Sequence, residues 1–223
     1  MLYVFDLDDT LYLEIRYVQS AFQAIDRYLK EQRLASSFFE ISWEIFTNGS
    51  HGQIFQQALT EEGIKYDDAL IQKLLRIYQT HPADIKLIED ARHTLELIRS
   101  LSEHETALIT DGTPVLQWNK IKALQLEYLI GTIIVTDDYG SRQYRKPHTR
   151  AFKAIQGQKD PDECIYIADN PAKDFIAPRE LGWNMSVRIR REGSLYRAQP
   201  TPSDCYEITT LEVLSYRILQ DRC

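Results

Sequence analysis

The sequence predicts an α/β fold, in which a doubly wound, mainly parallel sheet carries an inserted α-helical subdomain. Five short runs rich in Val, Ile, Tyr and Thr have the continuous apolar character of strands that are buried on both faces. Helical segments separate most of these runs, an alternation typical of parallel sheets. The exception is a gap of about 100 residues between the first two runs, which is too long for a plain crossover and predicts an insertion.

The predicted strands are placed first, because the candidate site depends on where they end. They are Leu2–Phe5, Thr106–Thr110, Thr132–Thr136, Cys164–Ala168 and Met185–Ile189. Asp137 and Asp138, after the third strand, are interpreted as a solvent-exposed turn. Three arginines of the last strand and its exit loop are interpreted as one polar face, namely Arg188, Arg190 and Arg191.

Most of the long gap is predicted to be helical. Apolar residues recur there at intervals of three and four, the pattern of an amphipathic helix, at Ile15, Val18, Phe22, Ile25 and Leu29. Leu70, Leu74 and Ile77 repeat the pattern, and Asn48-Gly49 and Glu62-Gly63 mark turns between helices. We therefore expect a core domain formed by residues 1–12 and 86–223, and a helical subdomain formed by residues 13–85.

Helices of the core domain are predicted from apolar spacing and from capping residues. One helix carries Ile88, Ala91, Leu95 and Ile98 back to the sheet, and Thr113-Pro114 is a typical start for another. Pro147 is expected to start a helix that contains Phe152. The segment Ala172–Leu181 is expected to be helical up to Gly182.

Composition and charge exclude several classes of protein. The chain has 223 residues and a net charge of −7, and an acidic protein gains little from a phosphate backbone, so we expect no nucleic-acid partner. No apolar stretch is long enough to span a membrane, and we expect no membrane partner. The three cysteines are too few for a disulfide framework. We therefore expect a protein of the reducing cytoplasm, and the sequence leaves any protein partner unknown.

Carboxylates cluster directly after the first predicted strand, at Asp6, Asp8 and Asp9. Such a cluster is costly without a compensating cation. Ligands of open α/β sheets bind at the carboxyl ends of the strands. The pattern therefore favours a site for a metal ion and a phosphate over a solvated acidic turn.

Polar residues also follow the later strands. Thr110-Asp111-Gly112 follows the second strand and precedes a helix start, where donors can bind an anion. Asp169 follows the fourth strand, with Asp174 a little further along. Lys146, just before Pro147, could hold a phosphoryl group and offset the repulsion between the carboxylates.

Together these elements resemble the haloacid dehalogenase-like (HAD) hydrolase superfamily. Asp6-x-Asp8-x-Thr10 is similar to its first motif, Thr110 to its second, Lys146 to its third, and Asp169 with Asp174 to its fourth. The resemblance extends over essentially the whole chain. It implies a Rossmann-like core with the first strand in the centre, flanked by the second and fourth, and a helical cap inserted after the first motif.

The resemblance also implies a reaction, the hydrolysis of a small phosphorylated metabolite of the sugar phosphate or nucleotide type. Asp6 would be the nucleophile and would form a phosphoaspartate. Asp8 would protonate the leaving oxygen and later deprotonate the attacking water. Mg²⁺ would lie between Asp6, the main-chain carbonyl of Asp8, and Asp169.

The remaining predicted roles concern binding and support. Thr110 and Lys146 would bind the phosphoryl oxygens, and Asp111 and Gly112 would lie beside them as part of the phosphate site. Asp174 would orient Lys146 or a metal-bound water. Thr10 would support the first motif. Tyr12, Glu14, Arg16 and Tyr17, where the core passes into the insertion, either face the substrate or are ordinary hinge residues.

Other activities remain open at this point. A phosphomutase, a phosphonatase or a dehalogenase has the same fold, although dehalogenases of the family generally lack the second carboxylate, so that Asp8 favours a phosphatase. A module that accepts a phosphoryl group without turnover, used in signalling or binding, is a further alternative. Multiple turnover would distinguish an enzyme from such a module.

Overall fold

The computed structural model describes residues 1–50 and 52–220. The chain divides into two compact units, one of Met1–Glu14 with Lys86–Cys223 and the other of Ile15–Ile85. Cys223 itself lies outside the described residues. No helix within the described ranges has the length and apolar character needed to cross a bilayer.

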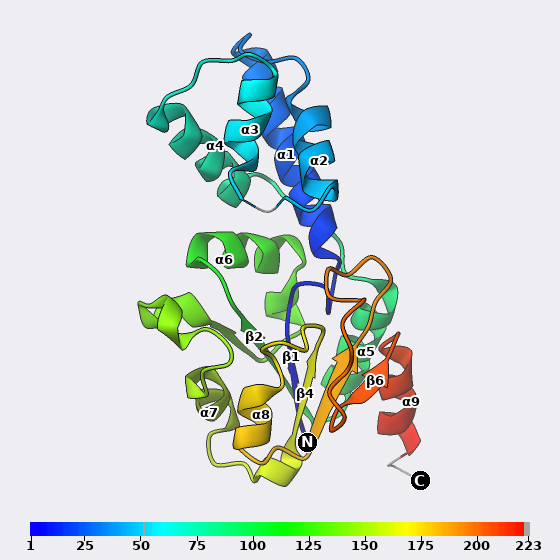
Figure 1. Cartoon of the computed structure of the whole chain (residues 1–223). Helices are drawn as coiled ribbons and strands as arrows, with labels where there is room; N and C mark the ends of the chain where they lie inside the picture. The colour runs from blue at the N-terminus through cyan, green and yellow to red at the C-terminus, as the bar shows by residue number, and fades with distance from the viewer. Residues whose placement is uncertain (51, 221–223) are drawn as a thin grey trace. The chain divides into compact units, whose positions relative to one another are not determined.

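The first unit contains a six-stranded sheet in which every neighbouring pair is parallel. Its order is β3-β2-β1-β4-β5-β6, so β1 lies between β2 and β4 as predicted (Figure 1). The doubly wound, parallel fold class is confirmed. The strands are β1 (Leu2–Phe5), β2 (Glu105–Thr110), β3 (Thr132–Val135), β4 (Cys164–Ala168), β5 (Met185–Ile189) and β6 (Tyr206–Ile208).

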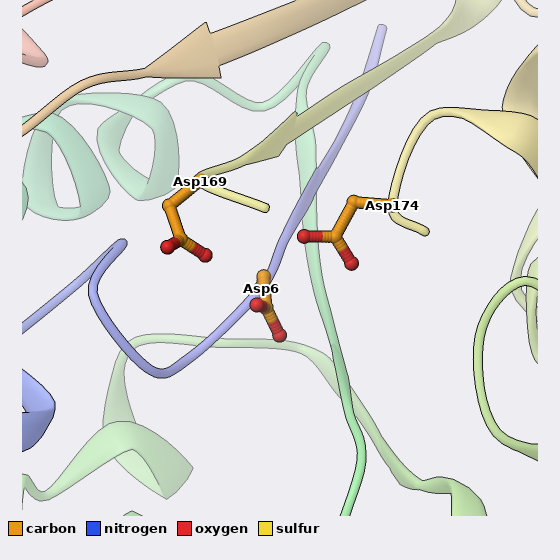
Figure 2. Close-up of side chains that lie close together, drawn as sticks. All are labelled: Asp6, Asp169 and Asp174. Atoms are coloured by element: carbon orange, nitrogen blue, oxygen red, sulfur yellow. The ribbon is translucent and has the colours of Figure 1, made fainter. Parts of the chain in front are cut away.

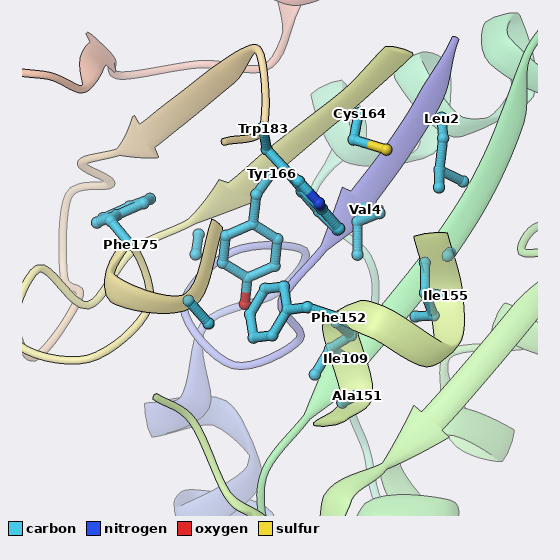
Figure 3. Close-up of a cluster of buried hydrophobic side chains, with 13 residues drawn as sticks. Leu2, Val4, Ile109, Ala151, Phe152, Ile155, Cys164, Tyr166, Phe175 and Trp183 are labelled. Carbon is cyan, nitrogen blue, oxygen red and sulfur yellow. The ribbon is translucent and has the colours of Figure 1, made fainter. Parts of the chain in front are cut away.

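Helices cover both faces of this sheet, which explains why its central strands are apolar throughout. Side chains of β1 and β4 with even residue numbers pack under α7 (Arg150–Gln156) and α8 (Ile176–Glu180), with Phe152 and Trp183 in the centre (Figure 3). Two further helices, α5 (Glu89–Ser100) and α9 (Glu212–Gln220), pack against each other on the other side of the sheet (Figure 1).

Two predicted helices of the core begin later than the sequence suggested. Pro147 does not start a helix, and α7 begins at Arg150. The predicted helix Ala172–Leu181 is helical only from Ile176 to Glu180. The physical reason is local, because Asn170 accepts a hydrogen bond from the Ala172 N–H and Asp174 accepts one from the Asn170 N–H, so that side chains replace the first helical turn.

The arginines of β5 correct a second prediction. Arg188 is completely buried rather than part of a polar face. Its guanidinium donates to the carbonyl of Asp169 (3.1 Å) and to those of Tyr196 (2.8 Å) and Gln199 (2.7 Å). Arg188 therefore ties the end of β4 to the loop that follows β5.

Arg191 is also buried, and it forms a bidentate ion pair with Asp90 of α5, with two N–O distances of 2.9 Å. Asp90 further accepts hydrogen bonds from Thr210 and from the Leu211 N–H, both at 2.8 Å. The Arg191 Nε donates to the Thr10 carbonyl (2.8 Å). This pair therefore joins α5, the segment before α9 and the loop after β1.

Loss of this pair should destabilise the protein in a pH-dependent way. Arg191→Met is expected to lower the free energy of unfolding at pH 7 by about 3 kcal/mol, because Asp90 stays buried without its cation. Burial alone would raise the pKa of Asp90, but Arg191 and the hydrogen bonds from Leu211 and Thr210 outweigh it and hold the pKa below its usual value. A carboxyl with a lowered pKa stabilises the folded state at pH values above its unfolded-state pKa of about 4. This stabilisation is lost as the pH falls through the folded-state pKa.

Urea unfolding at pH 7 and in acid measures this effect. The difference between wild type and Arg191→Met should shrink once the pH falls below about 4. Arg190→Met is the matched control, since Arg190 pairs with Glu207 at the surface and its loss should cost less than about 1 kcal/mol. A difference that is the same at both pH values would contradict the assignment.

The second unit is built from α1 (Glu14–Glu31, whose first residue belongs to the first unit), α2 (Phe38–Thr47), α3 (Ile54–Glu61) and α4 (Asp68–Thr80). The apolar spacing predicted its two longer helices, and Val18, Phe22, Ile25 and Leu29 are buried in its core. Inside this unit the Tyr17 hydroxyl donates to the Tyr78 carbonyl. A role as a cap over a substrate remains a prediction.

The chain reverses its direction across the sheet between β1 and β4. From β1 it passes to β2 and β3 on one side, and it then returns to β4 and β5 on the other. In open α/β sheets the crevice beyond the carboxyl ends of the strands at such a reversal is the usual ligand site. Asp6 and Asp169 are the residues that follow these two strands.

Candidate active site

Three carboxylates meet at the ends of β1 and β4. The Asp6 N–H donates to the Ile167 carbonyl (2.9 Å), which brings Asp6 beside the end of β4. One oxygen from each of Asp6, Asp169 and Asp174 lies within 4.8 Å of the others, and all three residues are buried (Figure 2). The structure thus brings together residues that are up to 168 positions apart in the sequence.

Lys146 supplies positive charge to this cluster. Its Nζ lies 2.7 Å from Asp6 Oδ1 and 2.8 Å from Asp174 Oδ1, and it donates to the Tyr166 hydroxyl (3.1 Å). Only 1% of its side chain is exposed. Burial alone would lower the pKa of Lys146, but Asp174 and Asp6 outweigh it and raise the pKa well above its usual value. The ammonium is therefore held charged between two carboxylates.

One ammonium does not compensate all of this negative charge. Burial, opposed by Lys146 and reinforced by Asp174, raises the pKa of Asp6 to about 7. Burial and then the charges of Asp6 and Asp174 raise the pKa of Asp169 to about 9. Among the described residues, Asp169 Oδ2 is buried and has no hydrogen-bond donor.

These observations fit a divalent cation. Buried carboxylate oxygens without a donor are costly unless a positive charge lies beside them. Carboxylates are hard oxygen ligands, which suit Mg²⁺. Lys146 contacts both Asp6 and Asp174, but only Asp6 and Asp169 line the pocket described below, so these two carboxylates could hold the ion. The sequence analysis grouped Asp8 with Asp6 and Asp169 at the metal site, whereas the structure groups Asp174 with them. Binding of the ion by the main-chain carbonyl of Asp8 remains a prediction.

The Asp8 side chain has a separate environment. Its Oδ1 accepts hydrogen bonds from Lys120 Nζ (2.8 Å) and from the Tyr12 hydroxyl. Its Oδ2 accepts one from Gln117 Nε2 (3.1 Å). Burial would raise the pKa of Asp8, but Lys120 and the hydrogen bonds from Tyr12 and Gln117 outweigh it and lower the pKa.

Sequence reasoning missed Lys120 and Gln117, which lie on α6 (Pro114–Ala123). They are three residues apart and therefore share one face of the helix. Their spacing, in a helix directly after the predicted anion site, was the one sequence pattern that could have pointed to these two residues. The spacing alone does not show which face of α6 turns toward the first motif. Thr113 and Pro114 do form the start of α6, as predicted.

The predicted phosphate-binding segment follows β2. Thr110 is buried, and its hydroxyl accepts a hydrogen bond from Gln117. The Asp111 carboxylate accepts hydrogen bonds from Thr136, from the Lys146 N–H and from Lys173. Since these internal contacts occupy the carboxylate, its main-chain N–H is what Asp111 could offer to a phosphate.

Gly112 has a φ of +146°, and a Cβ built there would lie 2.9 Å from the Gln117 Cγ. Glycine is therefore needed for Gln117 to pass this close to the main chain. Thr10 is fully buried in the first-motif loop, and its Oγ1 has no hydrogen-bond partner among the described residues. The predicted support of the first motif by the Thr10 side chain would thus rest on packing and remains a prediction.

A pocket of about 190 Å³ opens beside these groups within the first unit. It is lined by most of the predicted residues and by several that the sequence analysis did not single out as site residues. The predicted ones are Asp6, Asp8, Thr110, Asp111 and Asp169, and those not singled out include Arg145, Asn170, Lys173 and Tyr196. Lys146 and Asp174 are not among the lining residues, and Lys146 joins Asp174 to Asp6, which does line the pocket.

Two cations at this pocket are already paired. Lys173 Nζ lies 2.7 Å from Asp111 Oδ2, and Arg145 forms a bidentate pair with Asp137 (2.6 and 2.7 Å). Asp137 is therefore an ion-pair partner, which corrects its interpretation as a solvated turn residue. Among the residues where the core passes into the insertion, Glu14 lines the pocket.

Comparison with known proteins places this geometry in a family. Residues 3–187 match the sequence model of the family described as haloacid dehalogenase-like hydrolase. A glyceraldehyde 3-phosphate phosphatase from Methanocaldococcus jannaschii is 28% identical over 221 residues, which cover 95% of this chain and 93% of that protein.

Solved structures agree on the fold. The magnesium-bound HAD-hydrolase YfnB from Bacillus subtilis superposes with a TM-score of 0.68 at 20% identity, covering 98% of this chain and 97% of that one. A 2-haloacid dehalogenase from Pseudomonas syringae superposes with a TM-score of 0.64 at 19% identity, covering 98% of each chain. Phosphatases and dehalogenases both occur among the similar proteins, so the fold alone does not determine the chemistry of the site.

Proposed function

The chain belongs to the haloacid dehalogenase-like hydrolase family, and from this premise we propose that it is a Mg²⁺-dependent phosphatase acting on a small sugar phosphate through a phosphoaspartate at Asp6. It is a hydrolase of phosphate esters, as its family and the similarity to a curated phosphatase indicate. That relative's named substrate, glyceraldehyde 3-phosphate, makes a three-carbon sugar phosphate the first candidate here.

One observation carries the proposal. A second carboxylate, Asp8, lines the same pocket as Asp6 and is held by donors from α6 and Tyr12. Cleavage of a carbon–halogen bond releases a halide, which needs no proton. An alkoxide leaving from phosphorus does need one, and Asp8 would give it. The pair therefore favours a phosphatase over a dehalogenase.

In the first half of the reaction, a carboxylate oxygen of Asp6 attacks phosphorus while the bond to the leaving oxygen breaks. Asp8, whose pKa is lowered in the free protein, would take up a proton as the anionic substrate binds, because a nearby negative charge raises the pKa of a carboxyl. It would give this proton to the leaving oxygen as the alcohol departs. Thr110 and Lys146 would contact the phosphoryl oxygens, where charge gathers in the transition state. Asp174 would keep Lys146 in place through its 2.8 Å contact.

In the second half, Asp8 takes a proton from a water molecule, whose oxygen attacks phosphorus. The bond between phosphorus and Asp6 breaks, which releases inorganic phosphate and restores both carboxyl groups. Mg²⁺, held by Asp6 and Asp169, would supply the charge that offsets repulsion between Asp6 and an anionic substrate.

Phosphate release from a panel of esters tests this function. The panel contains glyceraldehyde 3-phosphate, a hexose phosphate, a nucleoside monophosphate and 4-nitrophenyl phosphate, each with Mg²⁺ and with a chelator. We expect multiple turnovers of the triose phosphate, a rate at least ~10²-fold lower in chelator, and recovery when excess Mg²⁺ is added. A rate that the chelator leaves unchanged would remove Mg²⁺ from the proposal. Release of one equivalent of 4-nitrophenol per chain, with the phosphoryl group retained on the protein, would indicate a phospho-accepting module instead.

A further inference from the structure

We propose that Lys120 is a positioning residue for Asp8, and that its buried ammonium anchors one carboxylate oxygen so that the other exchanges the proton with substrate and water. The inference rests on the proposed phosphatase function and adds a residue from α6 to it. It assigns a task to a lysine that lies outside the four motifs of the sequence analysis.

The burial of Lys120 is the first observation. Only 2% of its side chain is exposed, although lysine is among the residues that are almost never buried unless paired. Its Nζ lies 2.8 Å from Asp8 Oδ1 and 3.7 Å from Glu14 Oε1. A buried ammonium beside two carboxylates at the edge of a pocket is a costly arrangement, and its geometry is directed at Asp8.

The two oxygens of Asp8 are held unequally. Oδ1 accepts from both Lys120 and the Tyr12 hydroxyl, whereas Oδ2 accepts only the 3.1 Å bond from Gln117 among the described residues. Since a carboxylate oxygen has two lone pairs, Oδ2 retains the capacity to carry a proton. Lys120 therefore fixes which oxygen of Asp8 does the proton transfer.

Gln117 links this anchor to the phosphate site. Its amide donates to Asp8 Oδ2 and to the Thr110 hydroxyl. This side chain therefore fixes the distance between Asp8, which would transfer the proton, and Thr110, which is predicted to contact the phosphate. The bare main chain of Gly112 leaves room for this side chain. The same face of α6 thus orients Asp8 and connects it to Thr110.

The proposal predicts a loss that depends on the leaving group. Nitrophenolate leaves phosphorus without being protonated, whereas the alkoxide of a sugar phosphate needs the proton from Asp8. The ratio of kcat/KM for the triose phosphate to kcat/KM for 4-nitrophenyl phosphate reports this proton transfer, because kcat/KM covers the steps up to departure of the leaving group.

Lys120→Met removes the charge and the donors at nearly constant length. We expect this ratio to fall by ~10²-fold in Lys120→Met and in Asp8→Asn, with no further fall in the double variant. Lys120→Arg, which keeps a buried cation and donor, should recover most of the ratio. Lys122→Met, an exposed lysine two residues along α6, is the matched control and should leave the ratio unchanged.

The outcomes separate the two proposals. If wild type hydrolyses both esters and Lys120→Met lowers both values of kcat/KM equally, or neither, the positioning role is wrong and the phosphatase function stands. If wild type hydrolyses neither ester, the proposed function fails and this inference fails with it. Should Lys120→Met not fold, Lys120→Gln keeps a donor without the charge and allows the same comparison.

Discussion

Asp6→Asn is expected to lower phosphatase turnover by at least ~10³-fold, because the amide cannot form the covalent bond to phosphorus on which both halves of the reaction depend. Asparagine matches aspartate in size, so the main-chain hydrogen bond from this residue to the Ile167 carbonyl should be kept. Rapid mixing with substrate followed by acid quenching should show no phosphorylated protein in the variant. Turnover close to that of wild type would overturn the assignment of Asp6 as nucleophile.

Stability measurements separate this loss from misfolding. Burial raises the folded-state pKa of Asp6 to about 7, above its unfolded value of about 4, so the folded state binds more protons between these values. Without divalent cations, ionisation of Asp6 therefore costs stability as the pH rises from about 4 to 7. Asp6→Asn lacks this cost and should be at least as stable as wild type at pH 8 in chelator. Asp162→Asn, at an exposed position before β4, is the matched activity control.

Lys146→Met is expected to show the second-largest effect, a loss of ~10²–10³-fold in kcat, since it removes a buried cation from the place where phosphoryl charge develops. It should also lower the free energy of unfolding by about 3 kcal/mol or more, because Asp6 and Asp174 then face each other without their shared ammonium. Denaturant unfolding and steady-state kinetics measure the two effects.

The effect of Mg²⁺ on the stability of Lys146→Met tests whether the loss of the ammonium charge causes the destabilisation. Added Mg²⁺ should stabilise Lys146→Met more than wild type, because the cation then replaces part of the missing positive charge beside Asp6. Lys153→Met, an exposed lysine on α7, should behave as wild type in both measurements. A Lys146→Met variant with wild-type kcat would contradict the predicted contact between Lys146 and the phosphoryl group.

Much of the fold could be predicted because its signals are local. The apolar runs of β1 and β4 need no knowledge of their neighbours, and right-handed parallel connections restrict how such runs assemble. β6 and α9 were missed for the opposite reason. Tyr206–Ile208 is a three-residue edge strand with two exposed positions, and only its pairing with β5 identifies it.

Burial of charge was the least predictable feature. Arg188 lies in β5 and Arg191 just after it, and both were interpreted as part of a polar face, yet both are buried. Their partners are carbonyls of a later loop and Asp90 of α5, which is 101 positions away. A sequence pattern shows that a residue is charged, but whether a partner is available to compensate its burial depends on contacts between distant segments.

The same distinction applies to the candidate site. Asp6, Asp8 and Asp169 could be named from sequence because acidic residues directly after apolar strands are a local pattern, and parallel strands bring their carboxyl ends to one edge. The separation of Asp8 from the cluster of Asp6, Asp169 and Asp174 was not visible there. It arises because Lys146 lies between Asp6 and Asp174, while Lys120, 112 positions after Asp8, turns the Asp8 carboxylate toward α6. The rotation of a helix about its axis is set by packing against the sheet, which no local pattern contains.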